Sequence, residues 1–532
     1  MLHLIAASML AMSQQAQRPL PAWTRGATCY EVFVRSFHDS DGDGIGDLKG
    51  LIQKLDYIND GNPRSTRDLG ARCIWLMPVA ESPSYHGYDV TDYYRVEKDY
   101  GTNADFRQLM AAAHRRGIKV LVDMVLNHSS SEHPYFQAAL RDTASPYRAW
   151  YRWSPTKPSE LNPWGQSNWH KSPVRDEWYY GFFWGGMPDL NYTNRAVVDE
   201  AKKVARFWLK DMGADGFRLD AVPYLVEEPG HIDHSPGTHA VLREYGGFVR
   251  SIAPNSYTIG EVSEPSRVLY DYYPDQLDSY FAFQLADSMV AAVNRGTAGG
   301  MLTPLLDLQK NVPQQRWSPF LRNHDQPRTR SELGGDMQKS RVAATLLLAM
   351  PGMPFVYYGE EIGMTAVKPD PRLRTPMPWT ADRGAGFTTG VPWERLQDDS
   401  ATITVAAQDR DASSLLNLHR RLIHLRTRHP ALAEGTLVPL TTSDASVVAF
   451  VRRAGKRAVL VIANLGDKPI ATLAISSDAN ALPRGRWKLR DLLGAAPAHA
   501  LTVDHDGRLV SASPLDVVAP RTAYVLDLTP RP

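Results

Sequence analysis

The stretch Gly216-Phe-Arg-Leu-Asp-Ala221 is a short apolar strand that ends on an acid. Residues two apart on a strand share a face, so Arg218 and Asp220 are expected to point the same way. Three further apolar stretches also end on acids, namely Asp123, Glu261 and Asp325. A single acid there could equally cap the next helix. Four of them predict a shared site, because parallel strands present their carboxyl ends at one edge.

Short β-branched or aromatic stretches alternate with amphipathic helical ones from about Thr28 onward, which is typical of a parallel sheet. Eight strands are expected, at Cys29–Phe37, Ala71–Val79, Lys119–Asn127, Gly216–Ala221, Ser256–Val262, Ser279–Phe283, Pro319–Asp325 and Pro354–Gly359. Helices are expected at Asp105–Arg116, Ala196–Met212 and Gln338–Ala349. Eight such units predict an α/β fold, a closed (β/α)8 TIM barrel.

Two segments depart from a plain barrel. Roughly 65 residues separate the third strand from the helix near Ala196, far more than a βα loop needs, which predicts an inserted subdomain. After about Glu434 helical periodicity gives way to alternating strands, which predicts a C-terminal antiparallel β-sandwich. Residues 1–20 are expected to be a signal peptide or a disordered start. The expected domains are a barrel of 21–128 and 191–433, an insert of 129–190 and a sandwich of 434–532.

The insert is rich in tryptophan. It holds six of the 13 tryptophans of the chain: Trp150, Trp153, Trp164, Trp169, Trp178 and Trp184. A subdomain of this size needs its own core, so about half of them are expected to be buried. One or two are expected to line a cleft, and the sequence does not say which.

Composition limits the classes of partner. The 532 residues carry 59 Lys+Arg and 58 Asp+Glu, a net charge of +1 with no basic run, so a nucleic-acid partner is not expected. No segment reaches the roughly 18 apolar residues of a membrane span, so no membrane partner is expected. Cys29 and Cys73 lack C-x-x-C spacing, which argues against a disulfide framework and a zinc-thiolate site.

The N-terminus is expected to direct export. Leu2–Met12 is mostly apolar and is followed by a polar stretch, as in a secretory signal, although the usual basic start is missing. We therefore expect a secreted or periplasmic protein. The alternatives are a disordered start and a cytoplasmic location.

The acids suggest a reaction. Arg218 can hold Asp220 ionised by the opposite-charge effect. An ionised Asp beside a protonated Glu is the pair that glycoside cleavage requires, because one group attacks the anomeric carbon and the other protonates the leaving oxygen.

Six motifs support that interpretation. They are Asp123-Met-Val-Leu-Asn-His, Met187-Pro-Asp-Leu-Asn, Gly216-Phe-Arg-Leu-Asp-Ala, Gly260-Glu-Val, Asn323-His-Asp and Gly352-Met-Pro-Phe-Val-Tyr-Tyr-Gly-Glu-Glu. In this order they resemble the alpha-amylase family of glycoside hydrolases, over nearly all of the chain after residue 20. The set is highly specific, although any one motif alone would not be.

The resemblance implies roles for particular residues. Asp220 matches the nucleophile, Glu261 the general acid/base and Asp325 the carboxylate that stabilises the transition state. The implied sugar-binding groups are Arg218, Tyr88, His86, His128, His324, Asp370 and Arg374. The implied reaction is double displacement with retention, for which the two reacting carboxyls should lie about 5–5.5 Å apart.

Other positions bear on specificity. Relatives that cut at chain ends carry an Asp three residues before the stacking tyrosine, where this chain has Tyr85, so an open cleft and internal cutting are favoured. Ala221 resembles enzymes that act on alpha-1,4 bonds. Met187-Pro-Asp-Leu-Asn is similar to a group between oligo-1,6-glucosidases and neopullulanases. We therefore expect an alpha-amylase that acts on starch and maltooligosaccharides, as a monomer.

Two alternatives remain. Val222-Pro-Tyr-Leu and Arg374-Thr-Pro-Met-Pro-Trp-Thr resemble segments of trehalose synthases and alpha-glucosidases, and Pro223-Tyr224 replaces a Lys-His pair of many amylases. These features favour glucosyl transfer or isomerisation. A catalytically inactive, amylase-like binding protein is the other alternative, but it would lack Asp220, Glu261 or Asp325, and all three are present.

An acidic loop predicts a structural cation. Oxygen ligands recur at alternate positions, from the side chains of Asp39, Asp41, Asp43 and Asp47 and the backbone carbonyl of Ile45. This spacing suits Ca²⁺. Gly50 stands where an EF-hand needs Glu, so an isolated calcium loop is expected. A solvated acidic turn is the alternative.

Overall fold

The computed structural model describes residues 18–228, 231–478, 480–494, 496–510 and 512–530. The apolar stretch Leu2–Met12, on which the export prediction depends, lies outside these residues. Within them, no helix is both long and apolar enough to cross a lipid bilayer.

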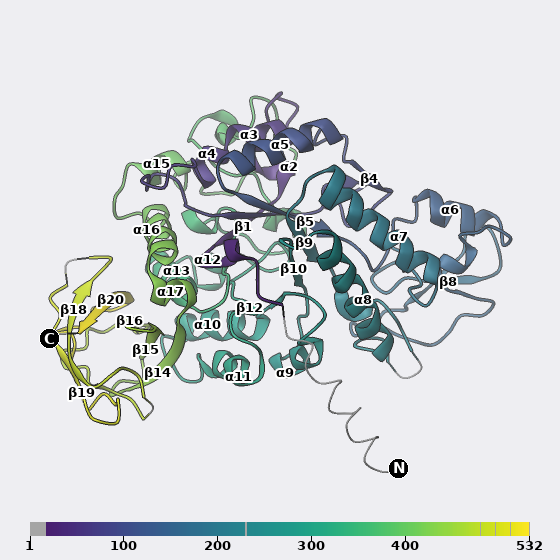
Figure 1. Cartoon of the computed structure of the whole chain (residues 1–532). Coiled ribbons are helices and arrows are strands. Elements are labelled where there is room, and N and C mark those ends of the chain that lie inside the picture. Colours follow the sequence, from purple (N-terminus) through teal and green to yellow (C-terminus); the bar gives the residue numbers. More distant parts are fainter. Residues whose placement is uncertain (1–17, 229–230, 479, 495, 511, 531–532) are drawn as a thin grey trace, which may run out of the picture.

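Eight parallel strands form the central sheet (Figure 1). They are β1 (Cys29–Val32), β2 (Cys73–Leu76), β5 (Lys119–Met124), β9 (Gly216–Leu219), β10 (Tyr257–Gly260), β11 (Ser279–Phe281), β12 (Trp317–Ser318) and β13 (Phe355–Tyr357). Their order is β12-β11-β10-β9-β5-β2-β1-β13. The amide of Phe355 donates to the carbonyl of Pro319 at 2.9 Å and brings the two ends of the sheet together. The predicted TIM barrel is confirmed.

Helices pack around the barrel. The longest are α5 (Asn103–Arg115), α7 (Arg195–Arg206), α8 (Pro236–Ile252), α10 (Phe283–Arg295), α13 (Met337–Ala349) and α16 (Leu415–Arg428). A capping box between Thr102 and Asp105 starts α5, and Gly117, at a φ of +73°, follows its end. The inside of the barrel is filled by apolar side chains, including Trp75, Leu121, Ile259, Phe281 and Phe355.

All eight barrel strands are shorter than predicted, and two differ from the prediction in more than length. Only Cys29–Val32 of Cys29–Phe37 is a strand, and Val34–Phe37 forms the helical turn α2, which packs Val34 and Phe37 into the core. The seventh strand lies at Trp317–Ser318 rather than within Pro319–Asp325. Proline has no amide hydrogen to donate to a ladder, so the chain leaves the sheet there and continues as a loop towards the rim.

The cysteines are bonded, contrary to the expectation from their spacing. A disulfide joins Cys29 of β1 to Cys73 of β2. These residues are direct partners in the parallel register of the two strands. Sequence spacing could not reveal this, because the 44-residue separation is set by the βα unit that lies between the strands.

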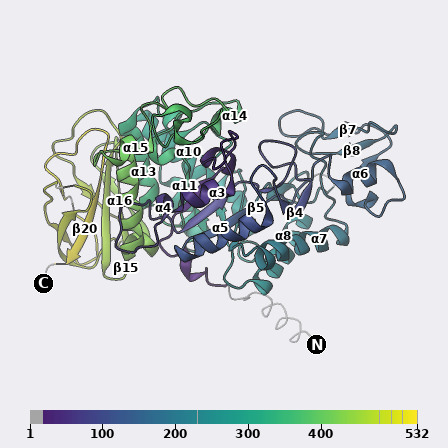
Figure 2. The same cartoon turned by 90° about the horizontal axis from the view of Figure 1, so that it is seen from above.

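The insert lies at one end of the molecule and the C-terminal sheet at the other, with the barrel between them (Figure 2). The insert contains α6 (Pro134–Arg141) and a sheet in the order β6-β8-β7, from Trp153–Ser154, Trp178–Tyr180 and Trp169–Lys171. Its tryptophans divide by exposure. Trp169 is buried, whereas Trp164 and Trp184 are 60% and 54% exposed.

The predicted C-terminal antiparallel β-domain is confirmed. Its sheet has the order β17-β14-β15-β16-β20-β18-β19. In chain order these strands are β14 (Thr436–Thr442), β15 (Val447–Ala454), β16 (Arg457–Asn464), β17 (Ile475–Ser476), β18 (Gly485–Asp491), β19 (Leu501–Val503) and β20 (Thr522–Pro530). The buried Arg452 of this domain donates to the carbonyl of Ala349 at the end of α13 and ties the domain to the barrel.

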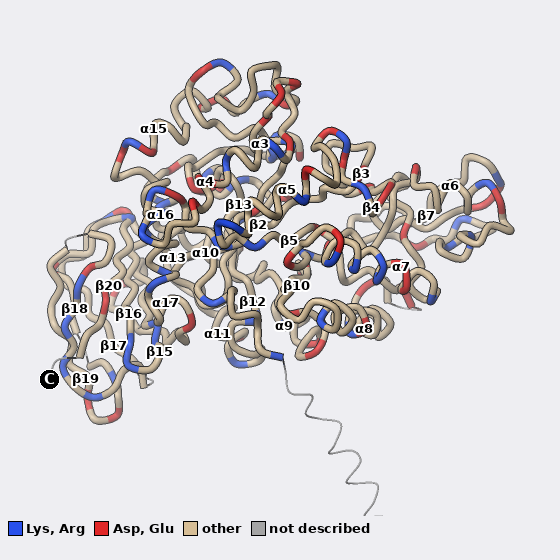
Figure 3. Tube along the Cα trace, turned by 45° about the horizontal axis from the view of Figure 1, so that its top comes forward, with Lys and Arg blue, Asp and Glu red and all other residues tan. Residues whose placement is uncertain are grey.

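Acidic and basic side chains are interspersed along the chain, as its near-neutral net charge leads one to expect (Figure 3).

Candidate active site

One buried guanidinium joins the acids at the strand ends. Arg218 is 1% exposed. Its Nη1 lies 2.6 Å from Oδ1 of Asp220 and 2.9 Å from Oδ1 of Asp123, and its Nη2 lies 2.6 Å from Oε2 of Glu261. Two carboxyls that contact the same guanidinium are close neighbours, so Asp220 and Glu261 are brought together as the sequence predicts.

Strand register explains this convergence. Arg218 on β9 pairs with Asp123 on β5 and with Ile259 on β10, and Glu261 directly follows β10. Ala221 then takes a left-handed conformation, at a φ of +47°, and turns the chain out of the strand. Its amide donates to Oε2 of Glu261 at 3.3 Å. The turn after Asp220 therefore also positions Glu261.

A second ionic network surrounds Asp325. Arg374 contacts its Oδ1 at 2.7 Å, and Nε2 of His324 lies 3.1 Å from its Oδ2. On the other side of the imidazole, Nδ1 of His324 lies 2.6 Å from Oε1 of Glu31. Sequence reasoning missed Glu31. The available indication was an acid inside the buried strand Cys29–Val32, where a charge needs a partner.

Tyr88 connects the two networks. Its hydroxyl lies 2.6 Å from Nε2 of His324, 3.2 Å from Oδ2 of Asp123 and 3.4 Å from Nη1 of Arg218. Its ring stacks on that of His324. His86 stacks on the Tyr88 ring, and Nε2 of His128 lies 3.1 Å from the Tyr88 carbonyl. The predicted sugar-binding histidines therefore surround one aromatic ring.

Burial and charge set the protonation of the acids. Burial raises the pKa of Glu261, against the opposing charge of Arg218. Burial also favours the neutral form of Asp325, but His324 and Arg374 outweigh it and hold its pKa below the usual range. Burial raises the pKa of Asp220 too, and its 2.6 Å ion pair with Arg218 opposes that shift. The site therefore favours a protonated Glu261 beside a charged Asp325.

Asp123 differs from the other strand-end acids. Its side chain is fully buried, and it accepts hydrogen bonds from Arg218 and from the Trp75 indole. Burial raises its pKa to about 7. It has no access to a ligand, so it acts by positioning Arg218.

Asp220, Glu261 and Asp325 lie in a cleft of about 680 Å³ between the barrel and the insert. Most predicted site residues line it, namely His86, Tyr88, His128, Asp220, Glu261, Asp325, Asp370 and Arg374. Arg218 and His324 are buried behind its wall. Asp370 is half-exposed and pairs with Lys368.

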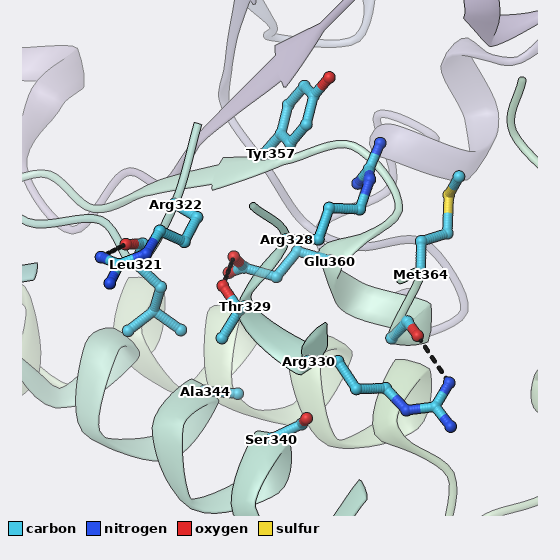
Figure 4. A pocket seen from close by; sticks show the side chains of 11 residues that line it. Leu321, Arg322, Arg328, Thr329, Arg330, Ser340, Ala344, Tyr357, Glu360 and Met364 are labelled. Carbon is cyan, nitrogen blue, oxygen red and sulfur yellow. Dashed lines mark hydrogen bonds between the residues drawn. The ribbon is translucent and has the colours of Figure 1, made fainter. Parts of the chain in front are cut away.

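A second cavity, at the edge of the barrel, contains none of these residues (Figure 4). There Thr329 donates to Oε2 of Glu360 at 2.7 Å, and Arg330 donates to the Gly363 carbonyl at 3.0 Å. Its volume of about 10 Å³ is barely enough to admit a single water. It is therefore no substrate site.

The acidic loop is only partly arranged as a cation site. Carboxylate oxygens of Asp39, Asp41 and Asp43 lie within 4.8 Å of one another. The amide of Ile45, in the same loop, donates to Oδ1 of Asp43. Asp47 instead caps helix α3 (Leu48–Gln53), accepting from the Gly50 amide at 2.8 Å. Three clustered carboxylates fit a hard cation such as Ca²⁺, with Asp47 supporting the loop.

Comparison with known proteins identifies the family. The model of the alpha-amylase catalytic domain matches residues 31–435. The chain belongs to the alpha-amylase family of glycoside hydrolases. Alpha-amylase 3 of Dictyoglomus thermophilum is 38% identical over 448 residues, which are 83% of this chain and 85% of that protein.

Other members of the alpha-amylase family are similar over comparable lengths. Trehalose synthase/amylase TreS of Mycobacterium tuberculosis is 36% identical over 492 residues, which are 81% of this chain and 80% of that protein. The crystal structure of alpha-amylase from H. orenii superposes with a TM-score of 0.83 at 39% identity, covering 94% of this chain and 99% of that one. Family membership therefore leaves the specific activity open between hydrolysis and glucosyl transfer.

The roles assigned to Asp220 and Glu261 predict different responses to the leaving group. With starch, Asp220→Asn and Glu261→Gln should each lower kcat by a factor on the order of 10⁴. With α-maltosyl fluoride, Glu261→Gln should still form the glycosyl-enzyme, because fluoride leaves without a proton. Asp220→Asn should form none, as measured by fluoride release. Rapid fluoride release by Asp220→Asn would contradict its role as nucleophile.

The ion pairs of His324 predict a pH dependence of stability. Burial alone would lower its pKa, but Asp325 and Glu31 raise it from 6.5 to about 9. Because the folded-state value is the higher one, this stabilisation is complete below about pH 6.5. It is lost as pH rises through about 9, and it amounts to about 3 kcal/mol.

Glu31→Gln replaces a charge with a neutral amide and should lower the folded-state pKa of His324 by about one unit. The stability lost as pH rises should therefore be smaller by about 1.4 kcal/mol. Urea unfolding at pH 6.5 and pH 9.5 measures it. Glu434→Gln, on the surface, is the control. Equal pH dependence in wild type and Glu31→Gln would refute the assignment.

Proposed function

We propose that this protein is an alpha-amylase that cleaves internal alpha-1,4 bonds of starch and maltooligosaccharides with retention. The observation that carries the proposal is the position of Tyr85 in the wall of the cleft. Its ring stacks on Trp393 at 5.4 Å, with the Arg374 guanidinium 5.7 Å from its centre, and it forms part of the cleft wall. A flat aromatic wall there supports a continuing chain of sugars, whereas a carboxylate would grip a terminal glucose.

The first step forms a covalent intermediate. A carboxylate oxygen of Asp220 attacks the anomeric carbon as the bond from that carbon to the glycosidic oxygen breaks. Glu261 transfers its proton to the departing oxygen, which leaves as a sugar hydroxyl. Arg218 keeps Asp220 oriented, and the charged Asp325 stabilises the positive charge that develops on the ring.

The second step reverses the roles. Glu261, now ionised, takes a proton from a water that attacks the anomeric carbon, and the bond to Asp220 breaks. Two displacements at the same carbon give net retention. Glu261 recovers its proton and Asp220 its charge, so the site is regenerated.

Glucosyl transfer is a second candidate. It uses the same intermediate, with a sugar hydroxyl in place of water. The 36% identity to a trehalose synthase/amylase supports it, as does the aromatic ring of Tyr224 at a position where many amylases carry polar groups.

We further propose a structural Ca²⁺ held by Asp39, Asp41 and Asp43, and export to an oxidising compartment. The clustering of these three carboxylates, whose oxygens lie within 4.8 Å of one another, supports the cation, because a positive charge relieves their mutual repulsion. The disulfide between Cys29 and Cys73 supports export, since disulfides persist in oxidising compartments. The protein is proposed to act as a monomer.

Internal cutting predicts a distinctive product pattern. A maltoheptaoside blocked at its non-reducing end should be cleaved at a rate within about twofold of the unblocked compound, because binding requires no free end. The viscosity of soluble starch should fall before many reducing ends appear. Conversion of maltose to trehalose would establish transfer instead. Release of glucose alone, from unblocked chains only, would establish cutting at chain ends.

The cation site predicts sensitivity to chelation. At a free Ca²⁺ concentration 100 times Kd, binding stabilises the fold by about 2.7 kcal/mol, so a chelator should lower Tm by a few degrees. Asp43→Asn should abolish most of that response. Asp516→Asn, an exposed acid of the C-terminal domain that pairs with His499, is the matched control. A wild-type Tm that does not change with chelator would contradict the site.

A further inference from the structure

A third cavity lies at the junction of the barrel and the C-terminal domain. Its volume is about 360 Å³, which is within the range of pockets that hold small ligands. Helices α13 and α16 form its barrel wall, and residues of β20 and at the end of β18 form its other wall. Both helices lie beside the C-terminal sheet in both views (Figures 1 and 2). The cavity shares no lining residue with the active-site cleft, so the proposed function leaves it unexplained.

Two arginines of the barrel wall are neighbours. Arg341 of α13 donates to the carbonyl of Ser413, and Arg421 of α16 donates to the carbonyl of Ala412 at 3.1 Å. Because these carbonyls are consecutive in the chain, the two guanidinium groups lie close together. In the part of the chain that the structure describes, neither group forms an ion pair. The barrel wall therefore presents two positive charges side by side.

The charge of this pair is not neutralised by the protein. Burial and the charge of Arg421 lower the pKa of Arg341, and the exposed Asp411 opposes that shift without cancelling it. The carboxylate of Asp411 instead accepts from the amide and the hydroxyl of Ser413, at 2.8 and 2.7 Å. Two like charges that share no carboxylate repel each other, so a bound anion would relieve the repulsion.

An ion pair holds the two walls of the cavity together. Nη1 of Arg521, directly before β20, lies 2.6 Å from Oδ2 of Asp336. The other oxygen of Asp336 caps α13 and accepts from the amides of Gln338 and Lys339. Arg521 takes a left-handed conformation, at a φ of +47°, which side chains rarely adopt. Because each wall is fixed to the other, the cavity needs no rearrangement to admit a ligand.

The C-terminal wall offers groups that suit hydroxyls. Oδ1 of Asp491 accepts from the Leu493 amide at 3.0 Å, and each carboxylate oxygen has further lone pairs. The Tyr524 hydroxyl accepts from the Ala519 amide at 3.1 Å and can also donate. A carboxylate repels a second anion, so this wall favours the neutral, hydroxylated part of a ligand.

We propose that this cavity, which we name the junction site, binds a small phosphorylated sugar. The phosphate group lies against Arg341 and Arg421, because planar guanidinium groups donate two parallel hydrogen bonds to phosphate oxygens. The sugar hydroxyls lie towards Asp491 and Tyr524. Such a ligand contacts the barrel and the C-terminal domain at once, so its binding stabilises the two domains together.

Titration calorimetry tests the junction site with glucose 6-phosphate, inorganic phosphate and glucose, at an ionic strength kept constant with potassium chloride. Glucose 6-phosphate should bind at least tenfold more tightly than inorganic phosphate, because the sugar hydroxyls add hydrogen bonds. At 100 times its Kd it should raise Tm by a few degrees. Glucose at the same concentration should not raise Tm.

The variants remove one charge at a time. Arg341→Gln and Arg421→Gln should each weaken glucose 6-phosphate binding at least tenfold, since each removes a charged donor to the phosphate. The ligand-free Tm should stay within about two degrees of wild type, because the lost charge belongs to a repulsive pair. Arg428→Gln is the matched control and should bind as wild type does. Arg428 is exposed on α16 and also donates to a backbone carbonyl, that of Pro63 at 3.0 Å, but it lies outside the cavity.

Equal affinity for glucose 6-phosphate in wild type and Arg421→Gln would overturn the junction site, as would a lack of binding by both phosphate compounds. Equal affinity for inorganic phosphate and glucose 6-phosphate would overturn the role of the sugar hydroxyls and identify free phosphate as the ligand. Glucose that binds as tightly as glucose 6-phosphate would contradict the role of the phosphate group.

Discussion

The buried charge of Arg218 is the constraint on which the site depends. A guanidinium at 1% exposure needs acceptors that compensate for its lost hydration, and here three carboxylates supply them, each from the end of a different strand. One cation cannot neutralise three carboxylates in a buried space. At least one acid therefore retains a proton more readily than it would in water, as the raised pKa values of Glu261 and Asp123 indicate. The charge imbalance that packing creates thus favours a protonated Glu261 beside the carboxyl of Asp220, which Arg218 pairs.

The network of Asp325 has the opposite balance. His324 and Arg374 provide two positive groups around Asp325, so its carboxyl remains ionised where it lines the cleft. Glu31 supports His324 from behind. The Tyr88 hydroxyl contacts both networks. It therefore links the network that raises the pKa of Glu261 to the network that lowers the pKa of Asp325.

The insert contributes a different kind of interaction. The barrel supplies charge and hydrogen bonds at the bottom of the cleft, whereas the insert supplies aromatic surface at its opening. An uncharged polysaccharide has apolar ring faces and hydroxyl groups, and these two walls suit them. The near-neutral net charge of the chain agrees with such a ligand.

The sequence by itself determined the barrel, the insert, the β-domain and the acids at the strand ends. Those features follow from local periodicity and from the rule that parallel strands end at one edge. Only the tertiary structure decided the pairings: Glu31 with His324, Cys29 with Cys73, and Asp47 with a helix amide rather than with the other loop acids. It also decided which tryptophans face the cleft. Such contacts join positions far apart in the chain or depend on where a loop closes, so neither spacing nor composition specifies them.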